Sequence, residues 1–181
     1  MKSMLVSLRV LLAFTLMTGV LYPLGITAVG LAFFKKEATG SLAVIDGKVV
    51  GSELIAQGFT QDRYFWPRPS TAKYDAANSG ASNQGLTSAA LIQDIQKREN
   101  EGAVADMRFS SGSGLDPHIS GQAARSQVER IVKARHLTGE KTQKLATLLV
   151  ASIEGRQLRI FGEERVNVLK LNMKLDQEFG Q

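Results

Sequence analysis

The chain has 181 residues, about the length of one domain, and 44% of them are hydrophobic, which suits an ordinary globular core. Its formal net charge is +5, but Lys2 and Arg9 precede a long uncharged segment, so the remainder holds 20 of the 22 basic residues against 17 acidic ones. Basic and acidic residues are interspersed without an arginine-rich run, which argues against nucleic acid as a partner. The absence of cysteine does not indicate either redox compartment.

The N-terminal segment predicts a helix that spans a membrane. Val10 to Phe34 is a run of 25 residues without charge, bounded by Arg9 and by Lys35-Lys36. A helix of this length would be about 37 Å long, against roughly 30 Å of hydrocarbon. A cleaved signal peptide has a shorter apolar region, and a core helix shows a polar stripe. We therefore expect a retained anchor that contacts membrane lipid.

Pro23 lies in the middle of this span and cannot donate a backbone N–H, so we expect a membrane kink between Tyr22 and Gly25. Basic residues flank both ends of the span, and the positive-inside rule barely distinguishes the two orientations. A short N-terminal segment before a single span favours a cytoplasmic N-terminus. The expected organisation is a tail and anchor over residues 1–36, with the span at about 10–34, and one soluble extracytoplasmic domain over residues 37–181.

Three features follow the span. Residues 41–59 predict a β-hairpin around Asp46-Gly47, because both turn residues tolerate positive φ. Tyr64-Phe65-Trp66 lies among arginines and could form a cation–π binding face, although burial against the hairpin is the commoner outcome. Residues 74–87 are small and polar and predict a loop, in which Asn83 could cap or cross-link neighbouring segments.

Helical periodicity dominates the second half of the chain. It predicts one helix over residues 88–102, a second after Ser120 that continues to Arg135, and a third that Thr138 caps and Gly155 ends. In the tail, alternating apolar residues favour a strand from Val166 to Leu171, although a helical stripe fits the same residues. Together these elements predict a fold of the α+β class, with one N-terminal transmembrane helix followed by a single mixed α/β domain.

The stretch from Ser110 to Gln122 brings serines, an aspartate and a histidine close together. A nucleophile elbow needs Gly-x-Ser-x-Gly, whereas Ser113 lies in Ser-Gly-Ser-Gly-Leu. A catalytic triad needs a hydrogen-bond chain that neighbours such as Asp116, His118 and Ser120 rarely form within one turn. One alternative stays open, a membrane-anchored extracytoplasmic hydrolase that uses Ser113 or Ser120 with His118.

Structural roles are easier to assign to this stretch. Gly112 and Gly114 permit the close approach of another segment. Asp116 can cap a turn, Pro117 fixes φ, and Ser120 can cap the helix that follows. A metal site is not indicated, because the chain has only two histidines and no cysteines, at spacings unlike those of zinc sites.

The sequence SGSGLDPHIS at residues 111–120 resembles the C subunit of the Kdp-type potassium-transporting ATPase of bacteria. The likeness extends to Tyr64-Phe65-Trp66, to Ala134-Arg135 and to the tail Arg165-Val166-Asn167-Val168-Leu169, and it covers nearly the whole chain. The resemblance implies a part in an ATP-driven, high-affinity potassium importer. The implied partners are a channel-like potassium-binding subunit, a P-type ATPase subunit and a small single-span subunit.

The resemblance further implies a non-catalytic accessory subunit of the bacterial inner membrane, which assembles and stabilises the complex and assists nucleotide binding indirectly. Asp-Lys-Thr-Gly-Thr, the phosphorylated motif of P-type pumps, is absent from the sequence, so the chain is not the motor. We expect no directly bound cofactor, because the partner subunits handle ATP and potassium. The candidate interface or structural residues are Ser111, Gly112, Gly114, Asp116, Pro117, His118, Ser120, Asn83, Arg165 and Asn167.

Overall fold

The structure of the protein is a computed structural model that describes residues 2–180. It combines helices and short strands, as the sequence predicts. The chain divides into two compact units, Met1–Leu42 and Ala43–Gln181.

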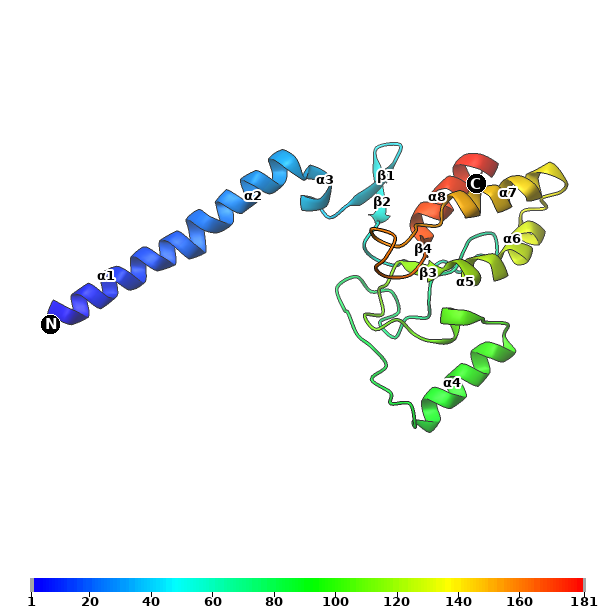
Figure 1. Ribbon diagram of the computed structural model, residues 1–181, viewed down its shortest axis with the longest axis horizontal. Helices are drawn as coiled ribbons and strands as arrows, with labels where there is room; N and C mark the ends of the chain where they lie inside the picture. The colour runs from blue at the N-terminus through cyan, green and yellow to red at the C-terminus, as the bar shows by residue number, and fades with distance from the viewer. Residues whose placement is uncertain (1, 181) are drawn as a thin grey trace. The chain divides into compact units, whose positions relative to one another are not determined.

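The first unit is almost entirely helical (Figure 1). It consists of α1 (Lys2–Leu16), the π-helical turn η1 (Met17–Leu21), α2 (Tyr22–Phe33) and the short α3 (Lys35–Ala38). The run Lys2–Phe33 is long and apolar enough to cross a membrane, and none of its most hydrophobic window is buried within the protein. The helix therefore starts earlier than the predicted span, and its apolar side chains need a lipid or protein cover.

The helix accommodates Pro23 by a change of hydrogen-bond pattern. Tyr22 N–H donates to the Met17 carbonyl, one residue further back than in an α-helix, and Pro23 occupies the first turn of α2. Proline perturbs the helical turn that precedes it. It has no N–H to donate to a carbonyl of that turn, and its ring clashes with the carbonyl four residues earlier. The irregularity expected at Tyr22–Gly25 accordingly lies one turn earlier, at Met17–Leu21.

The predicted hairpin is formed by β1 (Leu42–Ile45) and β2 (Lys48–Ser52), and all of it except Leu42 belongs to the second unit. Its turn residues, Asp46 and Gly47, have φ of +50° and +76°, which confirms the reason for the prediction. A long irregular segment follows, which includes the predicted loop at residues 74–87. It leads to α4 (Ala89–Asn100), where the Ser88 hydroxyl accepts a hydrogen bond from Leu91 N–H at 3.4 Å. None of the α4 residues is buried.

A small sheet lies at the centre of the domain. After the 3₁₀ turn η2 (Ala105–Arg108), β3 (His118–Ser120) pairs antiparallel with β4 (Arg165–Asn167), and Ile119 lies opposite Val166. The predicted second helix is in fact two, α5 (Gly121–Ser126) and α6 (Val128–Ala134). They are interrupted at Gln127, whose N–H bonds to the carbonyl three residues earlier. Its side chain holds both backbone groups of Trp66, at 2.8 Å and 3.1 Å.

The third predicted helix is confirmed as α7 (Glu140–Ala151), but both of its ends differ from the prediction. Gly139, with φ of +54°, precedes it as the N-cap residue in place of Thr138. The helix ends at Ala151, ahead of Gly155, because Glu154 leaves the helical path to form a β-bridge with Arg165.

The predicted strand at Val166–Leu171 is wrong beyond Asn167, where α8 (Val168–Phe179) begins. The Asn167 side chain accepts a hydrogen bond from Lys170 N–H at 3.1 Å and so caps this helix. Val168, Leu171 and Leu175 form a buried stripe at helical spacing. Burial of that stripe decides between the two patterns that the sequence allowed.

Helices α5 to α8 and the small sheet enclose the core. Phe65 is fully buried there, and its backbone N–H and carbonyl both bond to the side chain of Asn172, at 2.8 Å and 2.9 Å. Burial was predicted for the Tyr-Phe-Trp cluster, and for Phe65 it is correct. The partners of Phe65 are these helices, whereas the prediction placed the cluster against the hairpin. The buried core residues are Phe65, Ile119, Ala123, Ala124, Ile131, Leu137, Leu145, Leu149, Val166, Val168, Leu171 and Leu175.

Candidate functional site

Gly114 is the residue of the 111–120 motif that only glycine suits. Its φ is +70°, and a Cβ at this position would lie 2.7 Å from the Gly80 carbonyl oxygen and 2.9 Å from Ala72 Cβ. Ser111 beside it is buried, and its N–H donates to the Pro69 carbonyl at 3.2 Å. The expectation for Gly112 is wrong, because a Cβ there would have no atom within 4 Å. The motif packs the irregular segment that precedes α4 against the entry to β3.

Pro117 and Asn167 join the same region to the C-terminal helix. The buried Pro117 carbonyl accepts a hydrogen bond from Val168 N–H at 2.9 Å. Asn167 also donates its amide to the Glu53 carbonyl at 2.7 Å, which ties the segment after the hairpin to α8. Asn83 is exposed on the irregular segment with φ of +54° and does not line the polar surface hollow beside His118 and Ser120.

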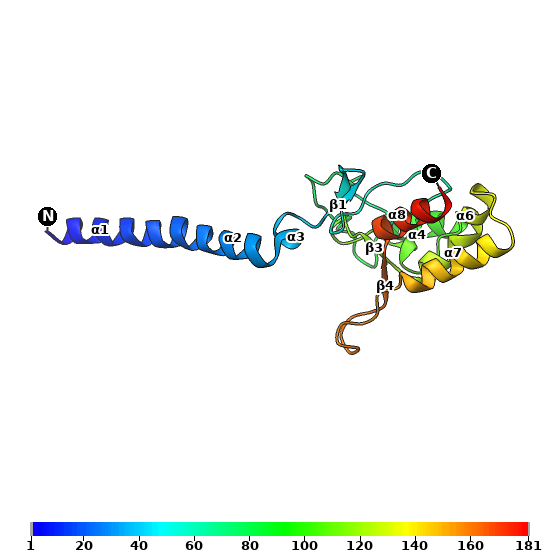
Figure 2. The same ribbon diagram turned by 90° about the horizontal axis from the view of Figure 1, so that it is seen from above.

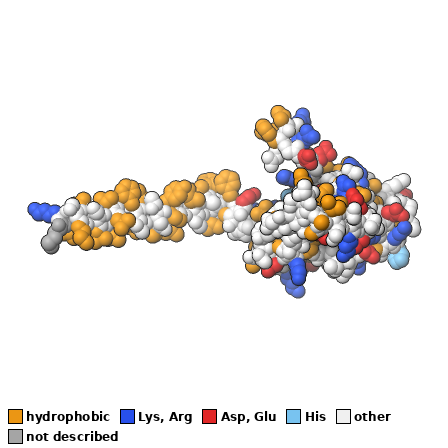
Figure 3. All heavy atoms as spheres, turned by 90° about the horizontal axis from the view of Figure 1, so that it is seen from below, with side chains coloured by type: hydrophobic (Ala, Val, Ile, Leu, Met, Phe, Trp, Pro, Cys, Tyr) orange, Lys and Arg blue, Asp and Glu red, His pale blue; other side chains and the backbone are white. Residues whose placement is uncertain are grey.

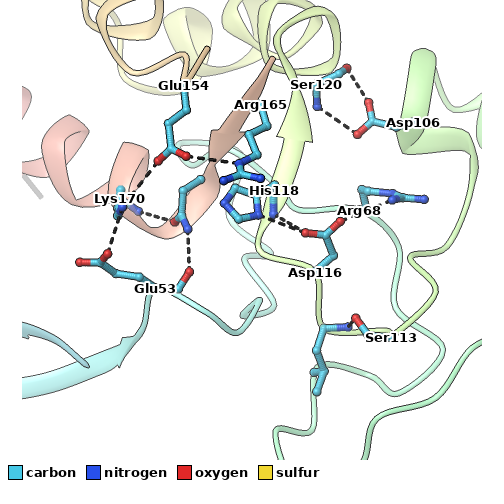
Figure 4. Close-up of polar contacts among 12 residues, drawn as sticks. Glu53, Arg68, Asp106, Ser113, Asp116, His118, Ser120, Glu154, Arg165 and Lys170 are labelled. Atoms are coloured by element: carbon cyan, nitrogen blue, oxygen red, sulfur yellow. Dashed lines mark hydrogen bonds and ion pairs between the residues drawn. The ribbon is translucent and has the colours of Figure 1, made fainter. Parts of the chain in front are cut away.

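A polar surface hollow of about 300 Å³ collects most of the remaining candidates. His118 and Ser120 are two residues apart on β3, so the two-residue period of a strand places both on one side. Figure 4 shows side chains of both charges converging there from several elements. The residues that line the hollow are Arg68, Asp106, Asp116, His118, Ile119, Ser120, Glu163, Glu164 and Arg165.

Asp116 is the centre of one set of contacts in this hollow. Its Oδ1 accepts the His118 backbone N–H at 3.0 Å and lies 3.3 Å from His118 Nδ1, while its Oδ2 lies 3.5 Å from an Arg68 guanidinium nitrogen (Figure 4). The hydrogen bond from the His118 ring, aided by the backbone bond and the Arg68 charge, lowers the pKa of Asp116. The carboxylate therefore stays ionised to a lower pH than an ordinary aspartate does.

Ser120 takes part in a second set of contacts. Its hydroxyl donates to Asp106 Oδ1 at 2.6 Å and its N–H to Asp106 Oδ2 at 3.0 Å (Figure 4). The same hydroxyl accepts Ala123 N–H at 3.1 Å, which confirms the predicted helix cap. Ser113 Oγ accepts Leu115 N–H at 3.1 Å. Over residues 2–180, neither serine hydroxyl makes a hydrogen bond to His118, the contact that a serine hydrolase would use to activate its nucleophile.

Arg165 belongs to a charged ladder beside the hollow. Its Nε lies 3.3 Å from Glu154 Oε2, and Lys170 Nζ lies 3.5 Å from the other oxygen of Glu154 and 3.0 Å from a Glu53 carboxylate oxygen (Figure 4). The hydrogen bond to Glu53, with further help from Glu154, raises the pKa of Lys170. The ladder connects the base of β4 with α8 and with the segment that follows the hairpin.

A buried charged cluster, absent from the sequence-based candidates, joins the end of α6 to α8. Arg135 Nη2 is 2.6 Å from Asp176 Oδ1, and the Tyr64 hydroxyl donates to Asp176 Oδ2 at 2.9 Å. Arg135 also donates to the Arg63 and Gly180 carbonyls, at 2.8 Å and 2.6 Å. Burial, followed by the bond to Asp176, raises the pKa of Tyr64. The Arg135 side chain is only 4% exposed, so this cluster is part of the packing.

The aromatic cluster makes its cation–π contacts within the protein. The Arg130 guanidinium lies 3.6 Å from the Trp66 ring centroid, and that of Arg135 lies 5.1 Å from the ring of Tyr64. Arg130 is further held by the Gln127 side chain at 2.8 Å. One face of the Trp66 ring and one face of the Tyr64 ring are therefore covered by arginines of the same chain.

Residues 2–180 form neither a metal-binding cluster nor a Ser–His–Asp chain of hydrogen bonds. No group of three or more His, Cys, Asp or Glu side chains in that range is arranged to hold a metal ion. Asp106, Arg68, Glu163 and Glu164 complete the hollow, yet sequence reasoning did not select them. Asp106 meets Ser120 from 14 positions away, and no local spacing signals that contact.

The fold defines a class, a protein with one N-terminal helix long and apolar enough to cross a membrane and a small α/β domain after it. Residues 4–177 match the family model described as K+-transporting ATPase, c chain. Similar relatives are each called potassium-transporting ATPase KdpC subunit. That of Leptospira interrogans is 45% identical, covering 97% of this chain and 94% of the relative, and that of Methylobacterium nodulans is 48% identical over 93% and 94%. The chain belongs to the KdpC family and is a component of a potassium-transporting ATPase complex.

Proposed function

We propose that the chain is a non-catalytic accessory subunit that assembles and stabilises the channel-like subunit and the P-type ATPase subunit of its pump, together with the small single-span subunit. ATP and potassium are bound by those partners. The proposal is supported by the apolar helix Lys2–Phe33 and by family membership. It is also supported by the hydrogen bonds that the Ser120 hydroxyl in the hollow already makes.

One observation carries the non-catalytic part of the proposal. The Ser120 hydroxyl, the best-placed nucleophile beside His118, already donates to Asp106 at 2.6 Å and caps α5. A hydroxyl that donates its proton to a carboxylate and accepts an N–H has no proton to give to an imidazole base. The His118–Asp116 pair has the base and orienting groups of a hydrolase, but its contacts serve the packing of β3.

The proposed orientation places the N-terminus in the cytoplasm and the domain outside the bacterial inner membrane. A domain on that side does not meet cytoplasmic ATP. Any effect on nucleotide affinity is then a coupling free energy transmitted through the complex, without contact between this chain and the nucleotide. Protease digestion of intact spheroplasts tests the orientation. Loss of the domain supports the proposal, and protection of the domain until the membrane is broken contradicts it.

His118→Ala in the full-length chain separates a subunit from an enzyme, and His136→Ala is the matched control because His136 is exposed outside the hollow. An accessory subunit predicts that His118→Ala loosens the pump in detergent, measured as loss of partner subunits during purification. A hydrolase predicts normal assembly with the loss of an intrinsic turnover that the wild-type chain shows alone, and that result would overturn the proposal.

A further inference from the structure

The segment from Gly155 to Glu164, called the finger here, projects from the domain between α7 and β4. Figure 2 shows it standing out beside β4, and Figure 3 shows a projection with apolar and basic side chains at its end and acidic ones toward its base. Three large apolar side chains in it are mostly exposed, with Leu158 at 83%, Ile160 at 70% and Phe161 at 62%. Single exposed apolar residues are ordinary, whereas three within four positions form a patch.

Hydrogen bonds hold the finger in a defined shape. At its base, Glu154 N–H donates to the Arg165 carbonyl at 2.8 Å, and Arg165 N–H returns a bond at 3.1 Å. Near the tip, Gln157 and Phe161 exchange two backbone bonds, both of 2.9 Å. A surface patch that is ordered before binding loses less conformational entropy when it docks.

The turn at the tip is built from residues that suit it poorly. Leu158 and Arg159 have φ of +50° and +62°, in the left-handed region where Asn-Gly is the preferred pair. The chain thus displays a leucine and an arginine at the tip in a conformation that disfavours both. Their exposure gives the domain itself no packing in return, which points to a contact outside this chain.

Charges around the patch favour a protein over a lipid surface. Arg156 and Arg159 lie next to the apolar side chains, and Glu163 and Glu164 follow them, so the four nearest charges sum to zero. Surface binding to a bilayer gains from a net positive charge, which this segment lacks. An apolar centre with a rim of both signs, rich in arginine, is instead the composition of a protein interface.

We propose that the finger docks into an apolar pocket with a charged rim on another subunit of the same pump. This proposal rests on the proposed function, since it assumes that the chain assembles with those subunits. Docking of the finger also holds the polar hollow close to that subunit. Glu163, Glu164 and Arg165 line the hollow and directly follow the apolar patch in the sequence. Leu158, Ile160 and Phe161 supply the anchor, and the rim charges set its orientation.

Photo-crosslinking in native membranes tests the docking directly. A photoreactive phenylalanine analogue is placed at position 158 of the full-length chain and, as a control, at position 150, where Val150 is 62% exposed on α7. Docking predicts a crosslink from position 158 to a larger pump subunit, at least about tenfold above that from position 150. Crosslinks only to lipid, or equal yields at the two positions, would overturn the proposal.

A second test removes the patch. In the variant Leu158→Ser/Ile160→Ser/Phe161→Ser, docking predicts at least a tenfold loss of co-purifying subunits, with the melting temperature of the domain unchanged. The control Leu86→Ser/Val150→Ser removes exposed apolar side chains elsewhere and should co-purify as the wild type does. If the wild-type chain brings down the pump and the finger variant does so equally, docking by the finger is wrong and the proposed function stands. If the wild-type chain brings down no pump subunit, the proposed function fails with it.

Discussion

Two clusters of charged side chains link distant segments of the domain, and they differ in their access to water. In the buried cluster, the side chains of Arg135 and Asp176 are 4% and 17% exposed. In the open cluster of the hollow, those of Arg68 and Asp116 are 23% and 36% exposed. Water screens an exposed pair, whereas a buried charge depends wholly on its partner. The buried Arg135–Asp176 pair therefore contributes more to the stability of the domain than the exposed Arg68–Asp116 pair, whose charges can be altered with little effect on folding.

Asp176→Ala is expected to have the largest effect, because it leaves the buried Arg135 guanidinium and the Tyr64 hydroxyl without their shared acceptor. We expect a loss of about 3–5 kcal/mol in the free energy of unfolding. Urea denaturation of the full-length chain in detergent measures it. The matched control is Asp62→Ala, since Asp62 is 67% exposed and 3.9 Å from Arg130, and its loss should be under about 0.5 kcal/mol. Equal effects of the two variants would remove the distinction between the clusters.

Gly114→Ala tests the packing that positions Asp116 in the open cluster. The added Cβ would meet the Gly80 carbonyl at 2.7 Å, in a backbone conformation that alanine disfavours. The steric clash and the unfavourable backbone conformation together predict a loss of about 2–3 kcal/mol in the free energy of unfolding. Gly112→Ala is the control from the same motif, and its Cβ would enter open space, so a change within about 0.5 kcal/mol is expected. A tolerant position 114 in thermal unfolding would show that the close approach to Gly80 is not needed.

Ser120→Ala removes the cap of α5 and one of the two hydrogen bonds to Asp106. A loss of about 1–2 kcal/mol is expected for a cap that also satisfies a carboxylate. Ser113→Ala should change the free energy of unfolding less, because Ser113 is exposed and only one short turn depends on it. The denaturation midpoints of the two variants measure this difference. A larger loss for Ser113→Ala than for Ser120→Ala would contradict the role of Ser120 as the cap of α5.

Asp116→Asn should have the smallest effect at neutral pH, under about 1 kcal/mol, because the carboxylate is partly exposed to screening water. Its signature is in the pH dependence. The pKa of Asp116 is lowered in the folded protein, so its stabilising contribution is present above the unfolded pKa of about 3.9 and is lost as the pH falls through the folded value. The difference between the wild type and Asp116→Asn should therefore disappear in acid. A difference that persists unchanged to pH 2 would contradict the contacts with His118 and Arg68.

The sequence predicted correctly those elements that depend on residues close together in the chain, such as a turn or a helix cap. The turn residues Asp46 and Gly47 identified the hairpin, and the side chain of Ser120 identified the start of α5. Helix α8 was misassigned, because two periodicities fit its residues and only burial against distant helices distinguishes them. Gly112 and Gly114 are equivalent in sequence and differ only in what the fold brings beside them.

The candidate site shows the same division. The contact of Asp116 with His118 joins residues two positions apart, so the motif alone brings these two groups near each other. The partners of Ser120 and Arg135 could not be inferred in this way, because Asp106 lies 14 positions from Ser120 and Asp176 lies 41 positions from Arg135. The motif residues Asp116, His118 and Ser120 lie together in the hollow, whereas the buried cluster of Arg135 and Asp176 carries no comparable signature in a single sequence.

The most direct test of a membrane-tethered accessory subunit is purification of the tagged, full-length chain from solubilised membranes of cells that carry the pump. We predict that the chain appears in the membrane fraction and brings the channel-like, P-type ATPase and small subunits with it in constant proportion. Recovery of the chain from the soluble fraction, or from membranes without those subunits, would contradict the account.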